Sequence, residues 1–217
     1  MNFVQRLILP LFRKEAQRHL LYGKRRKALA LFSTLYQWAP TTENQFNLAL
    51  CRMNLREYEP AIDLLQPVHN LIPDQLFAGI TYAQCLMLAK RFKEAEEVYQ
   101  RLFSINPENN LLKLLITLAQ DPVGRDKYVS SLDFQYQASL LQEEKQLKES
   151  LDLLLKAVEL TPEDAALHNN IGALKLKLKY PLQEVMTCFA IAMKLSPDSD
   201  RYKRNYRKVW QKSQSQK

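Results

Sequence analysis

The sequence predicts an all-α protein built from a repeated pair of short helices. Hydrophobic residues make up 47% of the 217 positions, which excludes a wholly disordered chain. Only four positions are glycine and runs of β-branched residues are few, so helices are favoured over strands. The stretch Leu76–Pro107 has the pattern of two amphipathic helices joined by a turn. Similar stretches lie on both sides of it at a spacing of about 34 residues.

Leu76–Pro107 indicates how such a pair of helices would pack. Counting from its first residue, the small residues Ala83 and Ala95 occupy positions 8 and 20, one in each expected helix. Small side chains let two helix backbones approach, and larger groups such as Tyr82 and Tyr99, at positions 7 and 24, fill the space around the crossing. The proline at position 32 ends the second helix because proline lacks an N–H group.

This pattern resembles the tetratricopeptide repeat (TPR), whose signature of about 34 residues carries small residues and a terminal proline at the same places. The resemblance implies a right-handed helical-repeat solenoid and covers most of residues 9–197. Two positions depart from the family pattern. Gly79 stands where the family usually has a large aromatic residue, and Leu102 where alanine is commoner. The glycine is expected to weaken the packing of its helix onto the preceding repeat.

The same frame, aligned on the terminal prolines, divides the chain into about five repeats. Three repeats precede an irregular segment at 108–130, which is either a degenerate half-repeat or a bent connector. One extra residue near Tyr180 lengthens the turn of the last repeat. The predicted organisation is an N-terminal segment at 1–8, three TPR-like repeats at 9–107 (9–40, 42–73 and 76–107), the irregular segment at 108–130, two repeats at 131–197 (131–162 and 165–197), a C-terminal capping helix at 198–212 and a disordered tail at 213–217.

Positive charge is concentrated at the two ends of the chain. The net charge is +8, yet residues 1–30 hold eight Lys and Arg against one Glu, and residues 198–217 hold seven against two Asp. A uniformly basic surface would favour nucleic acid, whereas basic ends suit capping helices, an acidic partner or a membrane surface. The predicted basic ends are Lys24, Arg25, Arg26 and Lys27 near the N-terminus, and Arg201, Arg204, Arg207 and Lys208 near the C-terminus.

The N-terminal stretch Phe3–Phe12 is apolar but is interrupted by Arg6 and Pro10. It is far shorter than the roughly 20 residues that cross a bilayer, and it lacks the features of a cleaved signal peptide. One interpretation is a turn that covers the first repeat, and the other is a segment that docks to a membrane surface or a partner. We expect a cytoplasmic protein, either free or at the periphery of a membrane complex.

No set of residues has the spacing of a catalytic or metal site. The three cysteines, Cys51, Cys85 and Cys188, lie far apart and are expected to be reduced thiols that pack in the interior. The chain has only three histidines, and it contains no metalloprotease, nucleophile-elbow or phosphate-loop motif. The sequence therefore predicts a protein that is not an enzyme and that uses no cofactor and no metal ion.

In TPR proteins the first helices of successive repeats line a concave groove, and the resemblance assigns certain positions of each repeat to it. In the second and third repeats these positions are unusually apolar for a surface, and in the later repeats they are rich in amides, which suit an extended backbone. The alternative is that tight curvature or the N-terminal segment buries them. The predicted partner-binding residues are Phe46, Asn47, Leu50, Met53, Asn54, Phe77, Ile80, Thr81, Gln84, Met87, Leu88, Gln135, Tyr136, Asn169 and Asn170.

Beyond the last repeat, residues 199–211 are predicted to form a helix that shields the apolar end of the solenoid. Tyr202, Tyr206, Val209 and Trp210 share one face of this helix, and basic residues lie elsewhere on it. Aromatic residues interleaved with Lys and Arg are also a pattern of nucleic-acid binding, but packing of a cap is the simpler interpretation.

The sequence thus favours a non-enzymatic scaffold or assembly factor for protein–protein interaction. It would hold a peptide or a helical segment of another protein in the groove, as chaperone-like TPR proteins hold a client. Two alternatives stay open: a nucleic-acid-binding repeat protein that uses the basic ends, and a scaffold that assembles with itself through its terminal helices. Contact with a membrane would be peripheral, and a homo-oligomer is compatible with the pattern.

Overall fold

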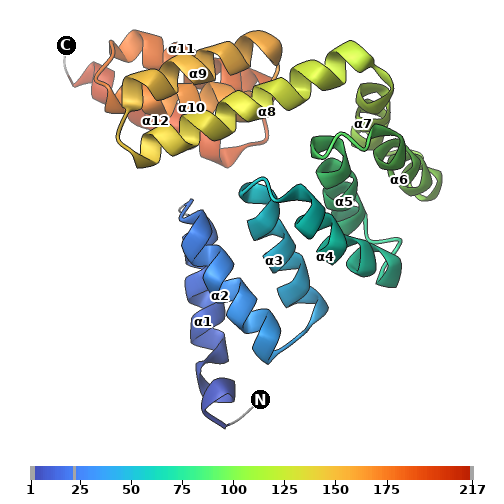
Figure 1. Ribbon diagram of the computed structural model, residues 1–217. Helices are drawn as coiled ribbons and strands as arrows, with labels where there is room; N and C mark the ends of the chain where they lie inside the picture. The colour runs from blue at the N-terminus through green and yellow to red at the C-terminus, as the bar shows by residue number, and fades with distance from the viewer. Residues whose placement is uncertain (1–2, 22, 216–217) are drawn as a thin grey trace. The chain divides into compact units, whose positions relative to one another are not determined.

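The computed structural model describes residues 3–21 and 23–215, and every helix or strand assigned in these ranges is an α-helix. The chain divides into two compact units, unit 1 at Met1–Pro122 and unit 2 at Val123–Lys217. Unit 1 stacks three helical hairpins in chain order and ends in a single helix, and unit 2 follows the same plan with two hairpins (Figure 1). The prediction of an all-α helical-repeat protein is confirmed.

The hairpins follow the predicted repeats, with one further helix at the end of each unit. We call the first helix of a hairpin its A helix and the second its B helix, and we call α7 and α12 terminal A helices because each begins where the next frame would begin. Unit 1 contains α1 (Phe3–Leu21), α2 (Arg25–Trp38), α3 (Thr42–Asn54), α4 (Tyr58–Leu71), α5 (Leu76–Leu88), α6 (Phe92–Ile105) and α7 (Asn110–Gln120). Unit 2 contains α8 (Pro122–Glu143), α9 (Leu147–Leu160), α10 (Ala165–Lys177), α11 (Leu182–Leu195) and α12 (Asp200–Gln214). The first residue of α8, Pro122, is the last residue of unit 1.

Each hairpin turns at one residue with left-handed backbone geometry. This residue stands at position 15 of its frame and has a φ between 60° and 70°, a region that residues with a Cβ atom rarely occupy. The next residue donates its N–H to the carbonyl at position 11 over 2.8 to 3.0 Å, which is the long hydrogen bond of a Schellman turn. The five left-handed residues are Gly23, Arg56, Lys90, Lys145 and Lys179. The five hairpins are therefore copies of one structural repeat.

Small residues at the helix crossing are fully buried, as their positions predict. Alanine occupies position 8 in the first four hairpins, and Gly172 occupies it in the last. A Cβ atom added to Gly172 would lie 2.9 Å from the Phe189 ring, so glycine lets α10 and α11 approach more closely than alanine would. The buried residues at position 8 are Ala16, Ala49, Ala83, Ala138 and Gly172. Those at position 24 are Phe32, Leu65, Tyr99 and Leu154, and Phe189 holds the matching place one residue later because the last turn has one extra residue.

The two departures from the family pattern in the third hairpin meet in the structure. A Cβ atom added to Gly79 of α5 would lie 2.8 Å from a Cδ atom of Leu102 in α6. Leu102 is 0% exposed, so its side chain occupies the volume that a larger residue in place of the glycine would need. The space beside Gly79 is thus filled from its own hairpin and is not left as a gap.

The N-terminal segment forms part of a helix and not a separate turn. The predicted boundary at residue 8 is wrong, because α1 continues through Pro10. Leu9 and Phe12 pack against the core of the first hairpin, which holds the helix together although the proline removes one backbone hydrogen bond. Leu7 and Leu11 point the other way and are 68% and 67% exposed. No helix in the described part of the chain is both long and apolar enough to cross a bilayer.

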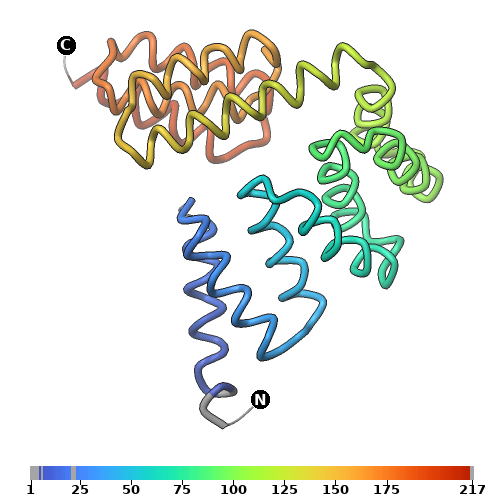
Figure 2. The backbone as a smooth tube through the Cα atoms, viewed as in Figure 1, coloured from blue at the N-terminus to red at the C-terminus, as the bar shows by residue number. Residues whose placement is uncertain are grey.

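The segment expected to be irregular at 108–130 contains one helix and the start of another. α7 packs on α6, as a half-repeat would. The second part is not a connector, because α8 begins at Pro122 and continues as a single helix of 22 residues to Glu143 (Figure 2). Proline is tolerated in the first turn of a helix, where its missing N–H would have no partner. The boundary predicted at residue 130 is therefore wrong.

The C-terminal helix also differs from its prediction. α12 packs on α11 and extends to Gln214, so the disorder expected from residue 213 is wrong at the first two positions, and residues 216–217 lie outside the described residues. Val209 is its buried residue, at 3% exposure. Trp210, which was expected on the packing face, is 47% exposed because successive helical residues point about 100° apart.

Candidate functional site

The A helices of unit 1 present one continuous surface. Arg13 Nη1 of α1 lies 3.4 Å from Glu43 Oε2 of α3. The ring of Phe46 in α3 lies 5.5 Å from the ring of Phe77 in α5, measured between centroids. Both contacts join position 5 of one A helix to position 2 of the next. The three A helices therefore turn the same side toward this surface.

α7 extends this surface by one more helix. Leu111 and Leu114 follow Phe77 and Ile80 by one repeat length, about 34 residues, and so hold positions 2 and 5 of the next frame. Their side chains are 52% and 67% exposed, and that of Phe77 is 65% exposed. Leu112, on another side of α7, is 0% exposed and belongs to the core of unit 1. One apolar side of α7 therefore packs against the core of unit 1, and a second apolar side is exposed.

We define the A face as the apolar residues at positions 2 and 5 of α3, α5 and α7, together with Leu50 at position 9 of α3. Single exposed apolar residues are normal on a protein surface, but exposed Phe and Leu side chains on one side of successive helices mark an interaction site. The Arg13–Glu43 ion pair borders the face at α1 and α3. The A face consists of Phe46, Leu50, Phe77, Ile80, Leu111 and Leu114.

Most of the predicted groove residues in unit 1 reach the surface. Phe46, Met53 and Ile80 also pack against the core, so a partner would meet only part of each side chain. Such anchored side chains lose little conformational freedom on binding. The half-buried residues are Phe46, Asn47, Leu50, Met53, Ile80, Gln84 and Leu88, and the exposed ones are Asn54 and Phe77.

Two predicted groove residues of α5 are not accessible, and the expectation is wrong for both. Met87 is 1% exposed and lies in the main core cluster of unit 1. Thr81 is 5% exposed, and its hydroxyl donates a 2.8 Å hydrogen bond to the Phe77 carbonyl. Eight of the 13 residues of α5 are buried, because neighbouring hairpins cover the helix on most sides.

Two of the three amide side chains predicted to bind a partner in unit 2 are used inside the unit. Asn169 of α10 is 1% exposed, and its Oδ1 accepts a 2.7 Å hydrogen bond from Asn205 Nδ2 of α12. The expectation that it meets a partner is wrong, because the capping helix covers it. Gln135 Nε2 lies 3.4 Å from Asp164 Oδ2. Tyr136 is half-buried and Asn170 is exposed. Because Asn169 and Gln135 are engaged within unit 2, we restrict the candidate site to unit 1.

The predicted basic ends lie at the surface. Each end is carried by a helix or turn, and the two ends belong to different units. Arg25 is half-buried at the start of α2. The exposed members are Lys24, Arg26 and Lys27 in unit 1, and Arg201, Arg204, Arg207 and Lys208 on α12 in unit 2.

The three thiols are buried and protonated. Burial raises the pKa of Cys51 and of Cys85 to about 12, and it also raises the pKa of Cys188. The thiolate is the nucleophile and the metal ligand, so these residues are structural at neutral pH. Among the side chains that the structure describes, no three His, Cys, Asp or Glu gather where they could hold a metal ion.

One histidine is part of the core of unit 1. His69 of α4 is 4% exposed and stacks on Tyr82 of α5 at 5.4 Å between ring centroids. Its Nδ1 atom has no hydrogen-bond partner in the described structure. Burial lowers the pKa of His69, and the nearby charge of Arg101 lowers it further. The side chain is therefore neutral at physiological pH and has a packing role.

Leu111 and Leu114 were missed as site residues at the level of sequence. The frame predicted to end at Pro107 stops three residues before α7 begins. The available signal was the repeat length itself, because counting about 34 residues on from Phe77 and Ile80 reaches these two leucines. A terminal A helix can therefore extend a repeat surface even where the sequence signature has ended.

Comparison with protein families matches residues 22–102 to the model described as anaphase-promoting complex, cyclosome, subunit 3 (ANAPC3). The match runs from the turn of the first hairpin to α6, within unit 1. No curated protein sequence matches the chain.

Several solved structures overlap with most of the chain at low sequence identity. TTC0263, a thermophilic TPR protein of Thermus thermophilus, is 15% identical with a TM-score of 0.49, and the overlap covers 93% of this chain and 98% of that one. A chain of the APC/C hetero-tetramer Cut9-Hcn1 is 14% identical with a TM-score of 0.48, covering 93% and 42%. MamA 41-end from Desulfovibrio magneticus RS-1 is 19% identical with a TM-score of 0.43, covering 88% and 97%.

Proposed function

We propose that the chain is a TPR-type helical-repeat protein and a non-enzymatic interaction scaffold whose A face binds an amphipathic helical segment of another protein. The family whose model matches residues 22–102 is named for a subunit of a multiprotein complex, which supports a role in holding proteins together. The buried, protonated thiols give no support to a catalytic role.

The exposure of large apolar side chains on successive A helices carries this proposal. Phe77, Leu111 and Leu114 are each more than half exposed and share one register. Burying a side chain of this kind contributes about 1.5 to 3 kcal/mol. Covering all three would offset much of the cost of association, which is about 4 kcal/mol or more.

The shape of the A face favours a helical ligand over an extended one. Its apolar residues lie on three successive A helices, which form ridges that a ligand must cross. A ligand helix with apolar residues at i, i+3 or i+4, and i+7 presents a stripe that can cross these ridges. The residues that define the face have no side-chain hydrogen-bonding groups for an extended backbone, although Asn47 and Gln84 of the same helices reach the surface.

Selection of binders from a displayed library of random peptides of about 16 residues tests the proposal. The variant carries Phe77→Asp and Leu114→Asp, which place charge on exposed positions and leave the core intact. The control is Leu71→Asp, because Leu71 is 69% exposed at the end of α4 and lies outside the A face. Circular dichroism checks that all three proteins are folded.

We expect selected peptides with an apolar stripe of helical spacing. Their affinity should fall by about tenfold or more in the Phe77→Asp, Leu114→Asp variant, a change of at least about 1.4 kcal/mol. The Leu71→Asp control should bind them as the unchanged protein does. Peptides that bind all three proteins equally, or a library that gives no binder, would contradict the proposal.

A further inference from the structure

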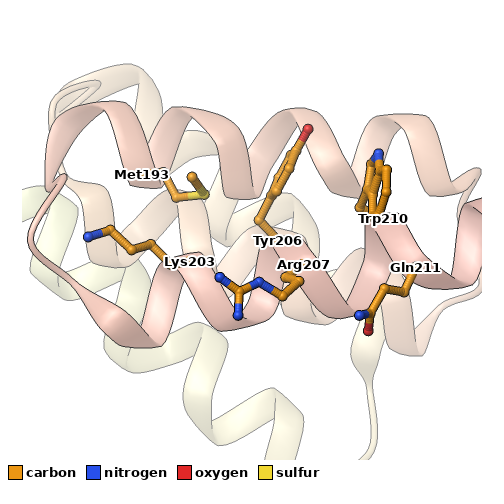
Figure 3. Close-up of a pocket in the computed structure, with 6 residues that line it drawn as sticks. All are labelled: Met193, Lys203, Tyr206, Arg207, Trp210 and Gln211. Atoms are coloured by element: carbon orange, nitrogen blue, oxygen red, sulfur yellow. The ribbon is translucent and has the colours of Figure 1, made fainter.

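A groove lies between the last two helices of unit 2, far along the chain from the A face. Its larger part is a hollow of about 480 Å³. Figure 3 shows Tyr206 and Trp210 rising from α12 toward the side that Met193 of α11 occupies. The hollow is lined by Met193, Lys203, Tyr206, Arg207, Trp210 and Gln211.

The groove continues along α11 as a second hollow. This hollow of about 280 Å³ shares Tyr206 with the first, and Met186, Ala190 and Ile191 form much of its wall. The lining residues of each helix recur every three or four positions, so each helix contributes one stripe. The stripe of α11 runs from Gln183 to Lys194, a length of about 17 Å at 1.5 Å per residue. That length suits a ligand helix of about three turns.

The position of the groove in the repeat plan points to a helix as its occupant. Tyr206 and Trp210 hold positions 7 and 11 of the frame that begins with α12. In α5 the same positions are held by Tyr82 and Leu86, which are 6% and 0% exposed in the hairpin with α6. In the described residues no B helix packs on α12, and Trp210 is 47% exposed. The groove is therefore the place that a B helix would fill.

The charge around the groove selects an acidic occupant. α12 carries six Lys and Arg against the single carboxylate of Asp200. In the described part of the chain, none of these six cations has a carboxylate within ion-pair distance. By contrast, Arg52 of α3 has a carboxylate partner, because its Nη1 lies 2.6 Å from Glu57 Oε2. Unpaired cations beside an apolar groove attract a ligand of opposite charge and steer its approach.

We propose that the α11–α12 groove is a second docking site, which binds an acidic amphipathic helix of a partner protein. The apolar stripe of that helix would cover Tyr206, Trp210 and Ile191. Its carboxylates would pair with Lys203 and Arg207 at the rim. This site is separate from the A face and does not depend on the function proposed for it.

Two other anionic ligands fit the groove less well. A bilayer binds protruding apolar side chains, whereas this apolar surface is recessed between two helices. Single-stranded nucleic acid stacks its bases on a series of aromatic rings. Here only two aromatic residues, Tyr206 and Trp210, line the groove, and Met186, Ala190 and Ile191 give the second hollow an aliphatic wall. A protein helix with leucine-like side chains matches this wall better.

The fluorescence of Trp210 reports on the site directly. Trp38 is the only other tryptophan, so the measurement uses the full chain with Trp38→Phe. The probe is a synthetic peptide of about 14 residues with leucines at i, i+3, i+4 and i+7 and glutamates on its other side. The comparison probe has lysines in place of the glutamates. We expect the acidic peptide to shift the Trp210 emission to shorter wavelength and the basic peptide to have no effect.

Charge reversal on two sides of α12 distinguishes binding in the groove from attraction by the net charge of the helix. Lys203→Glu with Arg207→Glu changes the rim of the groove. Arg204→Glu with Lys208→Glu makes the same change of net charge at exposed positions that do not line it. We expect the first pair to weaken binding of the acidic peptide by about tenfold or more, and the second by less than about threefold.

Several outcomes would overturn the inference. One is equal loss of binding in the two charge-reversed variants, and another is equal binding of the acidic and basic peptides. The same measurement is made with single-stranded oligothymidylate and with vesicles of anionic phospholipid. If either of these shifts the Trp210 emission in a manner that depends on Lys203 and Arg207, and the acidic peptide does not, the ligand class is wrong.

Discussion

The two terminal A helices, α7 and α12, hold the same place in the repeat plan but show opposite chemistry. At positions 2 and 5, α7 has Leu111 and Leu114, whereas α12 has Arg201 and Arg204. All four side chains are exposed. A terminal helix must cover the apolar end of its stack, and charged residues on its outer side are the usual way to keep that end soluble. α12 follows this rule, and α7 does not.

The difference separates covering a repeat stack from offering a surface to a partner. α7 is bound to unit 1 by buried residues such as Leu112 and Ala119 and still exposes leucines. α12 buries only Val209 and carries its cations outward, with the α11–α12 groove on its other side. Under the two proposals, a ligand would cover the exposed apolar residues of α7, and a partner helix would cover those of α12.

The largest expected effect is on the free energy of unfolding, when the buried residues that attach α7 and α12 to their units are truncated. Leu112→Ala removes a 0% exposed side chain from α7 and should lower the free energy of unfolding of unit 1 by about 2 to 5 kcal/mol. Val209→Ala removes two methyl groups from α12 and should lower that of unit 2 by about 1 to 2 kcal/mol. Urea unfolding of each variant gives these values. Equal losses would show that the two helices are anchored alike.

Exchanging the outer chemistry of α7 for that of α12 tests the comparison directly. Leu111→Arg with Leu114→Arg should leave the helix content unchanged, because both leucines are more than half exposed. Binding of the dye 8-anilinonaphthalene-1-sulfonate, measured by its fluorescence, should fall.

The peptides selected on the A face should bind this variant about tenfold more weakly or worse. The control is Leu155→Arg in α9, where the leucine is 38% exposed and belongs to unit 2. Retained peptide binding in the α7 variant would argue that its leucines are surface residues without a ligand.

His69 is expected to make the free energy of unfolding of unit 1 depend on pH. Its pKa is lowered in the folded state by burial, so the unfolded state binds the proton more readily. Stability is full above the unfolded pKa of about 6.5 and falls as the pH drops below it, by up to about 1.4 kcal/mol per pH unit. His69→Phe keeps a ring beside Tyr82 and should remove this part of the slope. The free energy of unfolding of both proteins is measured from pH 7.5 to 5.5, a range of about two pH units. Identical slopes in the two proteins would contradict the account.

The smallest effect tests what the two units share. Lys90 in unit 1 and Lys179 in unit 2 are the left-handed residues of their hairpin turns. Glycine adopts this backbone conformation without strain, so Lys90→Gly and Lys179→Gly should each raise the free energy of unfolding by up to about 1 kcal/mol. Gly23→Ala should lower it by a similar amount, because its strain comes from φ alone and no atom lies within 4 Å of an added Cβ. Thermal unfolding of the three variants measures the effects.

The repeat fold could be predicted because its signals are local. Small residues such as Ala83 and Ala95 and the terminal prolines mark each hairpin in the sequence. The left-handed turns gave a sequence signal only at Gly23, since Arg and Lys hold the other four. The segment 108–130 was expected to be irregular, and nothing local shows that Pro122 stands at the start of a long helix.

The candidate site was predictable only in part, because accessibility depends on neighbours that the sequence does not place. The family register assigned Phe46 and Phe77 to one surface, and their rings lie 5.5 Å apart between centroids. It also included Met87 and Asn169, which adjoining helices bury. Leu114 was left out because the repeat signature ends before α7, although the helical stack continues.

The most direct test of the A face is to find where its ligand lies. A peptide selected on the full chain is given a photoreactive diazirine group on its apolar stripe, and the cross-linked residues are identified by mass spectrometry. The account predicts cross-links to α3, α5 and α7, around Phe77 and Leu114. Cross-links confined to the B helices α4 and α6, or to unit 2, would contradict it.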